Sequence, residues 1–375
     1  MSDKVLCVVG TRPEAIKMSP VIRALRQADG LGCRVLVTGQ HREMLDQTLG
    51  ILGIEPDIDL ALMQRGQSLA SLTARLLEAL DQMLRAERPR VVLAQGDTTT
   101  VMCAALACFY LHIPFGHIEA GLRTFDTANP FPEEANRVIA TRLATWHFAP
   151  TQAAVNNLLR EGVPASAITL TGNTGIDAVL ETPAIELPDA LSDARGKRII
   201  LVTLHRRENL GDVLYQICQA LICLAERNPG IQIIFPVHPN PGVRDLVYPL
   251  LGRLANVSLC DPLDYRLFVA VMRRAYLVIS DSGGIQEEAP ACGVPVLVLR
   301  EKTERPEAIE LGVARLTGTA PASIIADTQR LLDDPALHAA MAHAVLPYGD
   351  GRSAGRIVDV LARYFETRQR TGEPG

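Results

Sequence analysis

The sequence predicts an α/β protein with two domains, each built on a parallel β-sheet that helices cover on both faces. Short runs of valine, isoleucine and leucine alternate with longer segments of helical periodicity along the whole chain. Continuous apolar strands separated by helices are typical of parallel sheets that are buried on both faces. The chain has 375 residues, more than a single hydrophobic core usually accommodates, so two domains are expected.

The expected elements follow one another in a regular order. Each expected strand is a short run rich in β-branched residues and leucine, and each expected helix carries apolar residues three or four positions apart. The first half gives strands over residues 5–9, 34–38, 91–95, 115–118 and 146–149, and helices over residues 14–27, 69–86 and 99–111. The second half gives strands over residues 198–203, 232–235, 257–259, 277–280 and 294–299, and helices over residues 213–226 and 263–273.

Residues 182–197 separate the two halves. This segment is rich in proline, glutamate, aspartate and alanine and lacks a strong apolar period, which is typical of a linker. We therefore expect a first domain over residues 1–181 and a second domain over residues 182–352.

The overall composition excludes several classes of protein. The net charge is −5, from 37 lysines and arginines against 42 acidic residues, so no basic surface for nucleic acid is expected. The longest apolar run, residues 101–111, is far shorter than the roughly 20 residues that cross a bilayer. The N-terminus runs directly into a short strand without a visible signal peptide, so we expect a cytoplasmic protein with no membrane partner. Eight cysteines without a Cys-x-x-Cys spacing predict reduced thiols, not disulfides or zinc.

One strand–turn–helix segment of the second half predicts a nucleotide site. Ser282, Gly283 and Gly284 follow the apolar run 276–279 and precede a helical segment. The glycines let the backbone approach a ligand, and the helix N-terminus offers free N–H groups and a positive dipole end to phosphate. Glu287 and Glu288 follow the turn, and a carboxylate there could accept the two hydroxyls of a ribose. Phosphate and ribose together indicate a nucleotide.

Charged side chains also follow most other expected strands, where parallel sheets bind their ligands. Arg12 and Lys17 follow the first strand and are candidate phosphate contacts, Asp97 and Glu119 follow the third and fourth, and His205 follows the first strand of the second half. Because both halves carry such clusters, we expect a cleft between the domains for a polar, anionic ligand. The Gly-x-Gly-x-x-Gly pattern of dinucleotide-binding folds is missing after the first strand.

Most of these residues also have a simpler structural explanation. Asp97 could be only the N-cap of the following helix. Glu133 stands in the first turn of an expected helix, where a carboxylate suits the dipole. His205 could cap a helix, and Arg12 could be a surface cation. Glu119 is harder to explain structurally, because carboxylates at the end of a buried strand are rarely left without a partner.

Nine short motifs occur in order along the chain. They are GTRPEAIKM from Gly10, QHREMLDQ from Gln40, GDTTT from Gly96, HIEAGLRT from His117, PEEANR from Pro132, TGNT from Thr171, HRREN from His205, DSGGIQEEAP from Asp281 and TERPEA from Thr303. Together they resemble the non-hydrolysing UDP-N-acetylglucosamine 2-epimerases of bacteria, from residue 5 to about residue 365. The resemblance implies a GT-B fold with two Rossmann-like domains, the active site in the cleft between them, and a last helix, residues 353–370, that packs back on the first domain.

The resemblance also implies a reaction, in which UDP-GlcNAc and UDP-ManNAc are interconverted by inverting C2 of the sugar. The C2 hydrogen is not next to a carbonyl, so its removal alone would leave an unsupported carbanion. If removal is coupled to departure of UDP from C1, the products are UDP and 2-acetamidoglucal, which recombine on the opposite face. This chemistry needs a base, an acid and groups that hold the leaving diphosphate, but neither a cofactor nor a metal. A homodimer that supplies ManNAc-type sugars for cell-surface polysaccharide is expected.

Individual residues match the motifs of that family. Asp97, Glu119, Glu133 and His205 match its catalytic residues. The implied substrate contacts are Arg12, Lys17, Ser282, Gly283, Gly284 and Arg305 at the diphosphate and neighbouring groups, Glu288 at the ribose, and Leu263 and Phe268 beside the uracil.

Some bacterial members of that family bind a second UDP-GlcNAc as an activator beside the active site. Gln40, His41, Gln67, Arg206 and His238 match that regulatory site. Glu43 and Gly66 depart from it, since glutamine and arginine are expected there, which puts activation in doubt. Leu204, before the catalytic histidine, is also bulkier than the glycine of close relatives.

Other functions share many of these motifs. A hydrolysing epimerase would release free ManNAc, and an epimerase of a modified UDP-hexosamine would differ only around the sugar. A GT-B glycosyltransferase would need an acceptor, and a nucleotide-sugar sensor would need no catalytic group. Which carboxylate removes the C2 proton in each direction also stays open.

Overall fold

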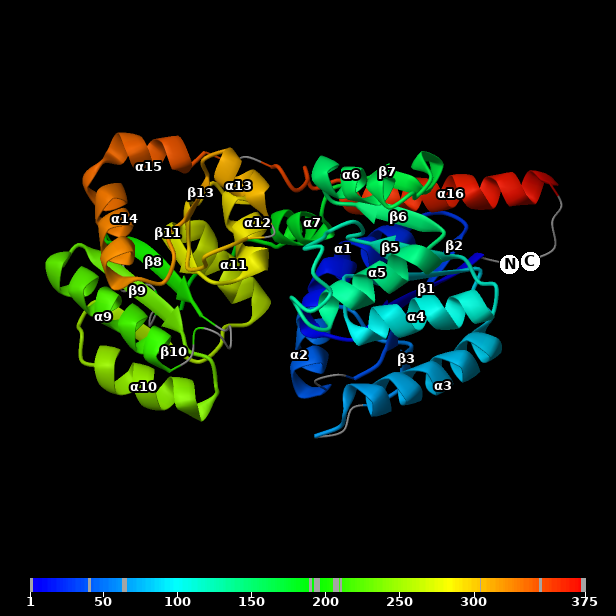
Figure 1. Cartoon of the computed structure of the whole chain (residues 1–375), viewed down its shortest axis with the longest axis horizontal. Coiled ribbons are helices and arrows are strands. Elements are labelled where there is room, and N and C mark those ends of the chain that lie inside the picture. Colours follow the sequence, from blue (N-terminus) through cyan, green and yellow to red (C-terminus); the bar gives the residue numbers. More distant parts are fainter. Residues whose placement is uncertain are drawn as a thin grey trace. The chain divides into compact units, whose positions relative to one another are not determined.

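The computed structural model describes residues 3–39, 42–62, 66–188, 191, 196–204, 209, 211–303, 305–343 and 346–371. The chain forms two compact units, Met1–Glu181 with Tyr348–Gly375, and Thr182–Pro347. Each unit has its own parallel sheet and its own helices (Figure 1). The expected α/β class with two parallel sheets is therefore confirmed.

The first unit contains a seven-stranded sheet in the order β3-β2-β1-β4-β5-β6-β7. Its strands are β1 (Asp3–Val9), β2 (Leu31–Val37), β3 (Ile58–Asp59), β4 (Val91–Gln95), β5 (Phe115–Ile118), β6 (Trp146–Ala149) and β7 (Ile168–Leu170). All neighbouring strands pair in parallel. The order reverses between β1 and β4, and ligands of such sheets bind beyond the strand ends at that reversal.

Helices cover both faces of this sheet. They are α1 (Arg12–Gln27), α2 (Arg42–Leu52), α3 (Leu69–Glu87), α4 (Thr99–Tyr110), α5 (Glu133–Leu143), α6 (Gln152–Arg160), α7 (Thr174–Glu181) and α16 (Ser353–Thr371), with a 3₁₀ turn at Ala165–Ala167. Successive residues of β1 face opposite sides. Val5, Cys7 and Val9 pack with α1, α2 and α16, whereas Leu6 and Val8 pack with α3 and α4. Burial on both faces explains the unbroken apolar run of β1.

The second unit contains a six-stranded parallel sheet in the order β10-β9-β8-β11-β12-β13. The strands are β8 (Arg198–Thr203), β9 (Ile231–Pro236), β10 (Val257–Cys260), β11 (Ala275–Ser280), β12 (Val296–Val298) and β13 (Ala314–Leu316). The helices are α9 (Asp212–Arg227), α10 (Pro241–Leu251), α11 (Tyr265–Arg274), α12 (Gly283–Ala291), α13 (Pro306–Glu310), α14 (Pro321–Asp333) and α15 (Pro335–Met341). The reversal lies between β8 and β11, so the turn that follows β11 is this unit's counterpart of the loop after β4.

Several short elements were not predicted from the sequence. Strands β3, β7 and β13 are only two or three residues long and lie at sheet edges, and all of their residues except Ala314 are half-buried or exposed. All eight cysteines are free thiols, four of them buried and four half-buried. Within the described part of the chain, no helix is both long and apolar enough to cross a membrane.

Candidate functional site

The reversal point of the first sheet begins with the loop after β1. Thr11 caps α1, and the Glu14 carboxylate reaches back to accept hydrogen bonds from the backbone N–H groups of Gly10 and Thr11, at 2.6 and 2.8 Å. The Thr98 hydroxyl donates to the same carboxylate at 2.6 Å. Burial raises the pKa of Glu14 to about 7, although these three hydrogen bonds act in the opposite direction. The N–H groups of this loop are therefore occupied by a side chain of the protein itself.

Glu119 lies directly after β5 with a backbone φ of 65°, in the left-handed region that few non-glycine residues adopt. Its side chain is 7% exposed. Lys17 Nζ donates to Glu119 Oε1 at 2.6 Å, Asn173 Nδ2 donates to the same oxygen at 3.1 Å, and Gln95 Nε2 donates to Oε2. Strained residues of this kind are common at functional sites. Lys17, expected at the diphosphate, contacts this carboxylate in the structure.

Asp97 follows β4 and the glycine at 96, whose φ is 90°. The helix α4 is capped by the Thr98 hydroxyl, which accepts from Val101 N, so the alternative that Asp97 is only an N-cap is wrong. Instead, the Asp97 carboxylate pairs with Arg137 of α5, and Asn136 Nδ2 donates to the Asp97 backbone oxygen at 2.9 Å. The Asp97 side chain is 30% exposed and therefore accessible to a ligand.

The two glutamates that begin α5 occupy different environments. Glu134 is 1% exposed and accepts from the backbone N–H groups of Thr124 and Phe125, at 3.0 Å each, and from Arg137 at 2.9 Å. Glu133 is half-buried at the first position of the helix. Glu134 therefore holds the preceding loop in place, whereas Glu133 keeps the exposure that a substrate contact requires.

His117, on β5, was not predicted as a site residue. Its Nε2–H donates to the Gly96 carbonyl oxygen at 2.7 Å, and burial lowers its pKa to about 4. It is therefore neutral near pH 7 and fixes the turn that carries Asp97. Sequence reasoning also missed Gln95, the last residue of an expected strand, and Asn173 of the TGNT motif, because only the fold shows that they contact Glu119.

The Ser-Gly-Gly turn of the second unit joins β11 to α12. Ser282 N donates to the Ser280 hydroxyl at 3.0 Å, and that hydroxyl also bonds the hydroxyl of Thr203 on β8 at 2.6 Å. Ser282 is the N-cap residue of α12 and makes no side-chain capping bond. Asp281, fully buried before the turn, accepts from Asn209 Nδ2 at 2.8 Å. These bonds fix the turn without using its side-chain cap, which suits the N-terminus of α12 to an anion.

Arg305 is held beside this turn. Its Nε donates to the buried Glu287 carboxylate, and its backbone N–H donates to the Thr303 hydroxyl at 3.2 Å. A Cβ atom on Gly283 would lie 2.6 Å from Arg305 Nη1, so glycine is required there for the guanidinium to reach the turn. A Cβ atom on Gly284 would meet only Glu288 Oε1, at an ordinary 3.5 Å.

The residues expected near the base and ribose lie on α11 and α12. Helix α11 begins at Tyr265, two residues later than predicted, because Asp264 caps it by accepting from Leu267 N at 2.9 Å. Leu263 therefore precedes the helix, and Phe268 lies within it; both are half-buried. Burial, with the nearby Glu288 charge, raises the pKa of Tyr265 well above its usual value, which places this tyrosine close to the expected ribose contact.

The remaining candidates are only partly described. His205, Gln40, His41 and Arg206 lie outside the described residues, as does the side chain of Glu43. His238 is exposed, and its Nδ1 accepts from Asn240 N at 3.2 Å. Gln67 accepts from Arg75 Nη2, and Arg12 is half-buried at the start of α1.

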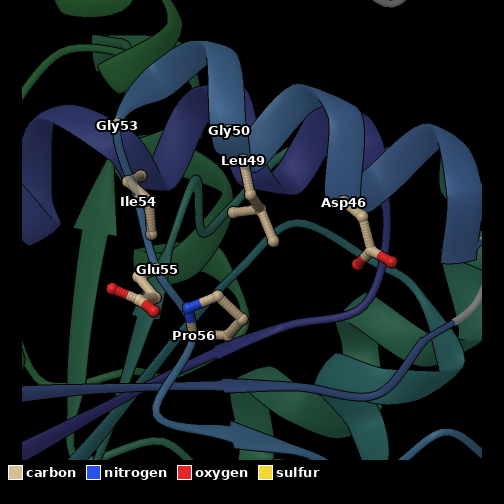
Figure 2. A pocket seen from close by; sticks show the side chains of 7 residues that line it. All are labelled: Asp46, Leu49, Gly50, Gly53, Ile54, Glu55 and Pro56. Atoms are coloured by element: carbon tan, nitrogen blue, oxygen red, sulfur yellow. The ribbon is translucent and has the colours of Figure 1, made fainter.

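An open groove of about 490 Å³ lies beside α2. Figure 2 shows its lining, which comes from Asp46, Leu49 and Gly50 of α2 and from the following residues 53–56. None of the expected site residues that the structure describes lines it. Among the described residues, no cluster of three or more His, Cys, Asp or Glu side chains could hold a metal ion.

Comparison with known proteins gives extensive matches. A family profile described as UDP-N-acetylglucosamine 2-epimerase matches residues 23–362. A UDP-N-acetylglucosamine 2-epimerase of Salmonella typhimurium is 50% identical over 96% of this chain and 99% of its own length. The Escherichia coli K12 protein of the same name is 49% identical over 96% of this chain and 98% of its own length.

Solved structures match equally well. A UDP-GlcNAc 2-epimerase from Neisseria meningitidis bound to UDP-GlcNAc has a TM-score of 0.88 and 42% identity, covering 96% of this chain and 100% of that one. A UDP-GlcNAc 2-epimerase from Methanocaldococcus jannaschii in complex with UDP-GlcNAc and UDP has a TM-score of 0.83 and 33% identity, covering 96% and 99%. The expected two-domain, GT-B-like α/β fold is thus confirmed. The protein is an isomerase and belongs to the UDP-N-acetylglucosamine 2-epimerase family.

Proposed function

We propose that this enzyme interconverts UDP-GlcNAc and UDP-ManNAc without hydrolysis, by eliminating UDP and adding it back to the opposite face of 2-acetamidoglucal. The observation that carries the proposal is the pair of carboxylates at the reversal point of the first sheet. Glu119 is held by Lys17, Gln95 and Asn173, and Asp97 is held by Arg137. Two fixed carboxylates can act as acid and base, which is what proton exchange at C2 requires.

The second unit supplies the groups that the departing UDP needs. The N-terminus of α12 and the Arg305 guanidinium, which lies against Gly283, suit the diphosphate, whose charge grows as the C1–O bond breaks. We assign Glu288 to the ribose, and Leu263 and Phe268 to the uracil. Relatives with UDP-GlcNAc or UDP bound support this choice of ligand.

The proposed reaction is balanced without an oxidant. One carboxylate takes the C2 proton while the electron pair of that C–H bond forms the C1–C2 double bond and UDP leaves with the electrons of the C1–O bond. Re-addition returns the UDP oxygen to C1 and delivers a proton to C2 from the other face. We further propose that His205 and Glu133 take part in these proton transfers, as their match to the family motifs implies.

The test is incubation with UDP-GlcNAc in deuterated water, followed by NMR of the sugar. We expect deuterium at C2 of both UDP-GlcNAc and UDP-ManNAc, and slow release of UDP and 2-acetamidoglucal on long incubation. Epimerisation with complete retention of the C2 hydrogen would reject elimination. Accumulation of free ManNAc would show that water reaches the intermediate and that the enzyme is hydrolysing.

A further inference from the structure

Asn173 lies in a motif whose role the proposed reaction does not explain. It is 2% exposed and directly precedes α7. Its Oδ1 accepts from the backbone N–H of Gly175 at 2.9 Å, and its Nδ2 donates to Glu119 Oε1 at 3.1 Å. Because an N–H donor faces one end of the amide, the amide can be oriented only with its NH₂ group toward the carboxylate. The contact with Glu119 is therefore a donor contact set by the fold.

The backbone of Asn173 is held as firmly as its side chain. Its N–H donates to the Tyr348 carbonyl oxygen at 2.5 Å, where the chain re-enters the first unit. The neighbouring Gly172 has a φ of 90°, and a Cβ there would lie 2.7 Å from Ser353 Oγ and 2.9 Å from Gly349 Cα. The loop that carries Asn173 is thus packed against the return segment, residues 348–353.

We propose that Asn173 is a positioning residue for Glu119. Its amide holds the Glu119 carboxylate in the ionised form and links the position of that carboxylate to the return segment. The proposal rests on the proposed function only in that Glu119 is a reacting group there. A buried carboxylate that accepts hydrogen bonds to its charged form is easier to ionise.

Two cations near Glu119 favour the same state, and the like charge of Asp97 is itself paired with one of them, Arg137. Lys17 donates to Glu119 from α1, and Arg137 of α5 adds a second favourable positive charge. His117 of β5 is neutral near pH 7 because its pKa is about 4, so it contributes no charge there. In this environment an asparagine adds a donor without adding a charge. An aspartate at the same position would remove the donor and add a like charge.

The experiment compares Asn173→Asp and Asn173→Ser with the unaltered enzyme. Aspartate retains an oxygen for Gly175 N–H, and serine can accept the same bond but is too short to reach Glu119. Glu119 is titrated directly by NMR of ¹³C-carboxyl-labelled glutamate, with the signal assigned by its loss in Glu119→Gln. We expect the pKa of Glu119 to rise by about one pH unit or more in Asn173→Asp and by less in Asn173→Ser. The limb of the epimerisation pH profile that reports on Glu119 should move to higher pH by the same amount.

The matched control is Asn156→Asp, the same change at an exposed residue of α6 in the same unit. It should leave both the titration and the pH profile unchanged. An unaltered Glu119 titration in folded Asn173→Asp would overturn the proposal, even if that variant were less stable. If the unaltered enzyme did not epimerise UDP-GlcNAc, the proposed function would fail, but the titration would still decide the role of Asn173.

Discussion

At the scale of single residues, the backbone N–H groups of the turn after β1 bind a carboxylate of the protein itself. A glycine turn leading into a helix is a common phosphate site, and the sequence predicts phosphate contacts after β1 at Arg12 and Lys17. The structure instead places the Glu14 carboxylate on the N–H groups of Gly10 and Thr11. A Cβ on Gly10 would also lie 2.5 Å from Thr100 Oγ1, so the turn has no room for a larger residue.

Glu14 gives a pH-dependent prediction. Folding raises its pKa from about 4.5 to about 7, so the folded state binds this proton more tightly than the unfolded state. Its contribution to stability is therefore present below pH 4.5 and lost as the pH rises through 7. Relative to Glu14→Gln, the free energy of unfolding should fall by about 2.5 kcal/mol between pH 5 and pH 8. Urea titrations followed by the fluorescence of Trp146, the single tryptophan, which lies in β6, would measure this. Parallel pH curves for the two proteins would contradict it.

At the scale of elements, the contact between the loop before α7 and the return segment leaves little space for a side chain at Gly172. Gly172→Ala would both strain a left-handed residue and push Ser353 and Gly349 away. The matched control is Gly162→Ala, because Gly162 has a φ of 82° in the same unit and nothing within 4 Å of a Cβ. The control should lose about 1–2 kcal/mol of unfolding free energy from backbone strain alone. Gly172→Ala should lose a further 1–3 kcal/mol or so from overpacking.

The same pair of variants separates packing from function. If the return segment fixes Asn173, Gly172→Ala should also lower turnover at temperatures where the protein stays folded, whereas Gly162→Ala should not. Urea unfolding and initial rates on the same preparations give both results. Equal losses of unfolding free energy in the two variants would show that the return segment moves to accommodate the added methyl group.

A second element-scale prediction concerns the turn after β11. Gly283→Ala should displace Arg305, because the added Cβ would lie 2.6 Å from its guanidinium, whereas Gly230→Ala adds an atom with nothing within 4 Å. UDP at 100 times its dissociation constant should stabilise the unaltered protein by about 2.7 kcal/mol. In differential scanning fluorimetry this stabilisation should appear as a UDP-dependent rise in Tm of the Gly230→Ala control. The rise should be much smaller for Gly283→Ala. An undiminished rise in Gly283→Ala would remove Arg305 from the diphosphate site.

At the scale of the whole molecule, the structure bears on regulation by a second nucleotide sugar. Gly66 is exposed with a φ of 71°, a conformation in which the arginine expected from the resemblance would be strained. With glycine there and glutamate at position 43, a second nucleotide sugar would lose a cationic diphosphate partner and meet an added negative charge. We therefore predict turnover of UDP-ManNAc from the first moments of the reaction, without added UDP-GlcNAc. Progress curves should show no lag. A lag that small amounts of UDP-GlcNAc abolish would show that activation persists despite Glu43 and Gly66.

The sequence predicts the strands of the two sheets better than the side-chain contacts at the ends of those strands. Central strands such as β1 and β4 are unbroken apolar runs, whereas β3 and β13 are too short and too exposed to give a pattern. Asp97 and Glu119 could be predicted because the ends of parallel strands gather at one edge. Their partners could not, since Lys17 is 102 positions and Asn173 is 54 positions from Glu119, and only folding brings them together.

The self-occupied turn after β1 has a consequence for how nucleotide recognition could change. The Glu14 carboxylate uses the N–H donors of Gly10 and Thr11 in that turn, whereas the N-cap residue of the turn after β11 makes no side-chain capping bond. If the turn after β11 is the anchor for the nucleotide, changes of base or phosphate preference can accumulate in α11, α12 and α13 while Asp97 and Glu119 keep their partners. Substitutions in these helices could therefore alter nucleotide recognition separately from the residues around Asp97 and Glu119. Conversely, we expect removal of the Glu14 carboxylate to free the N–H groups of Gly10 and Thr11 for an anion at the sheet edge that carries Asp97 and Glu119.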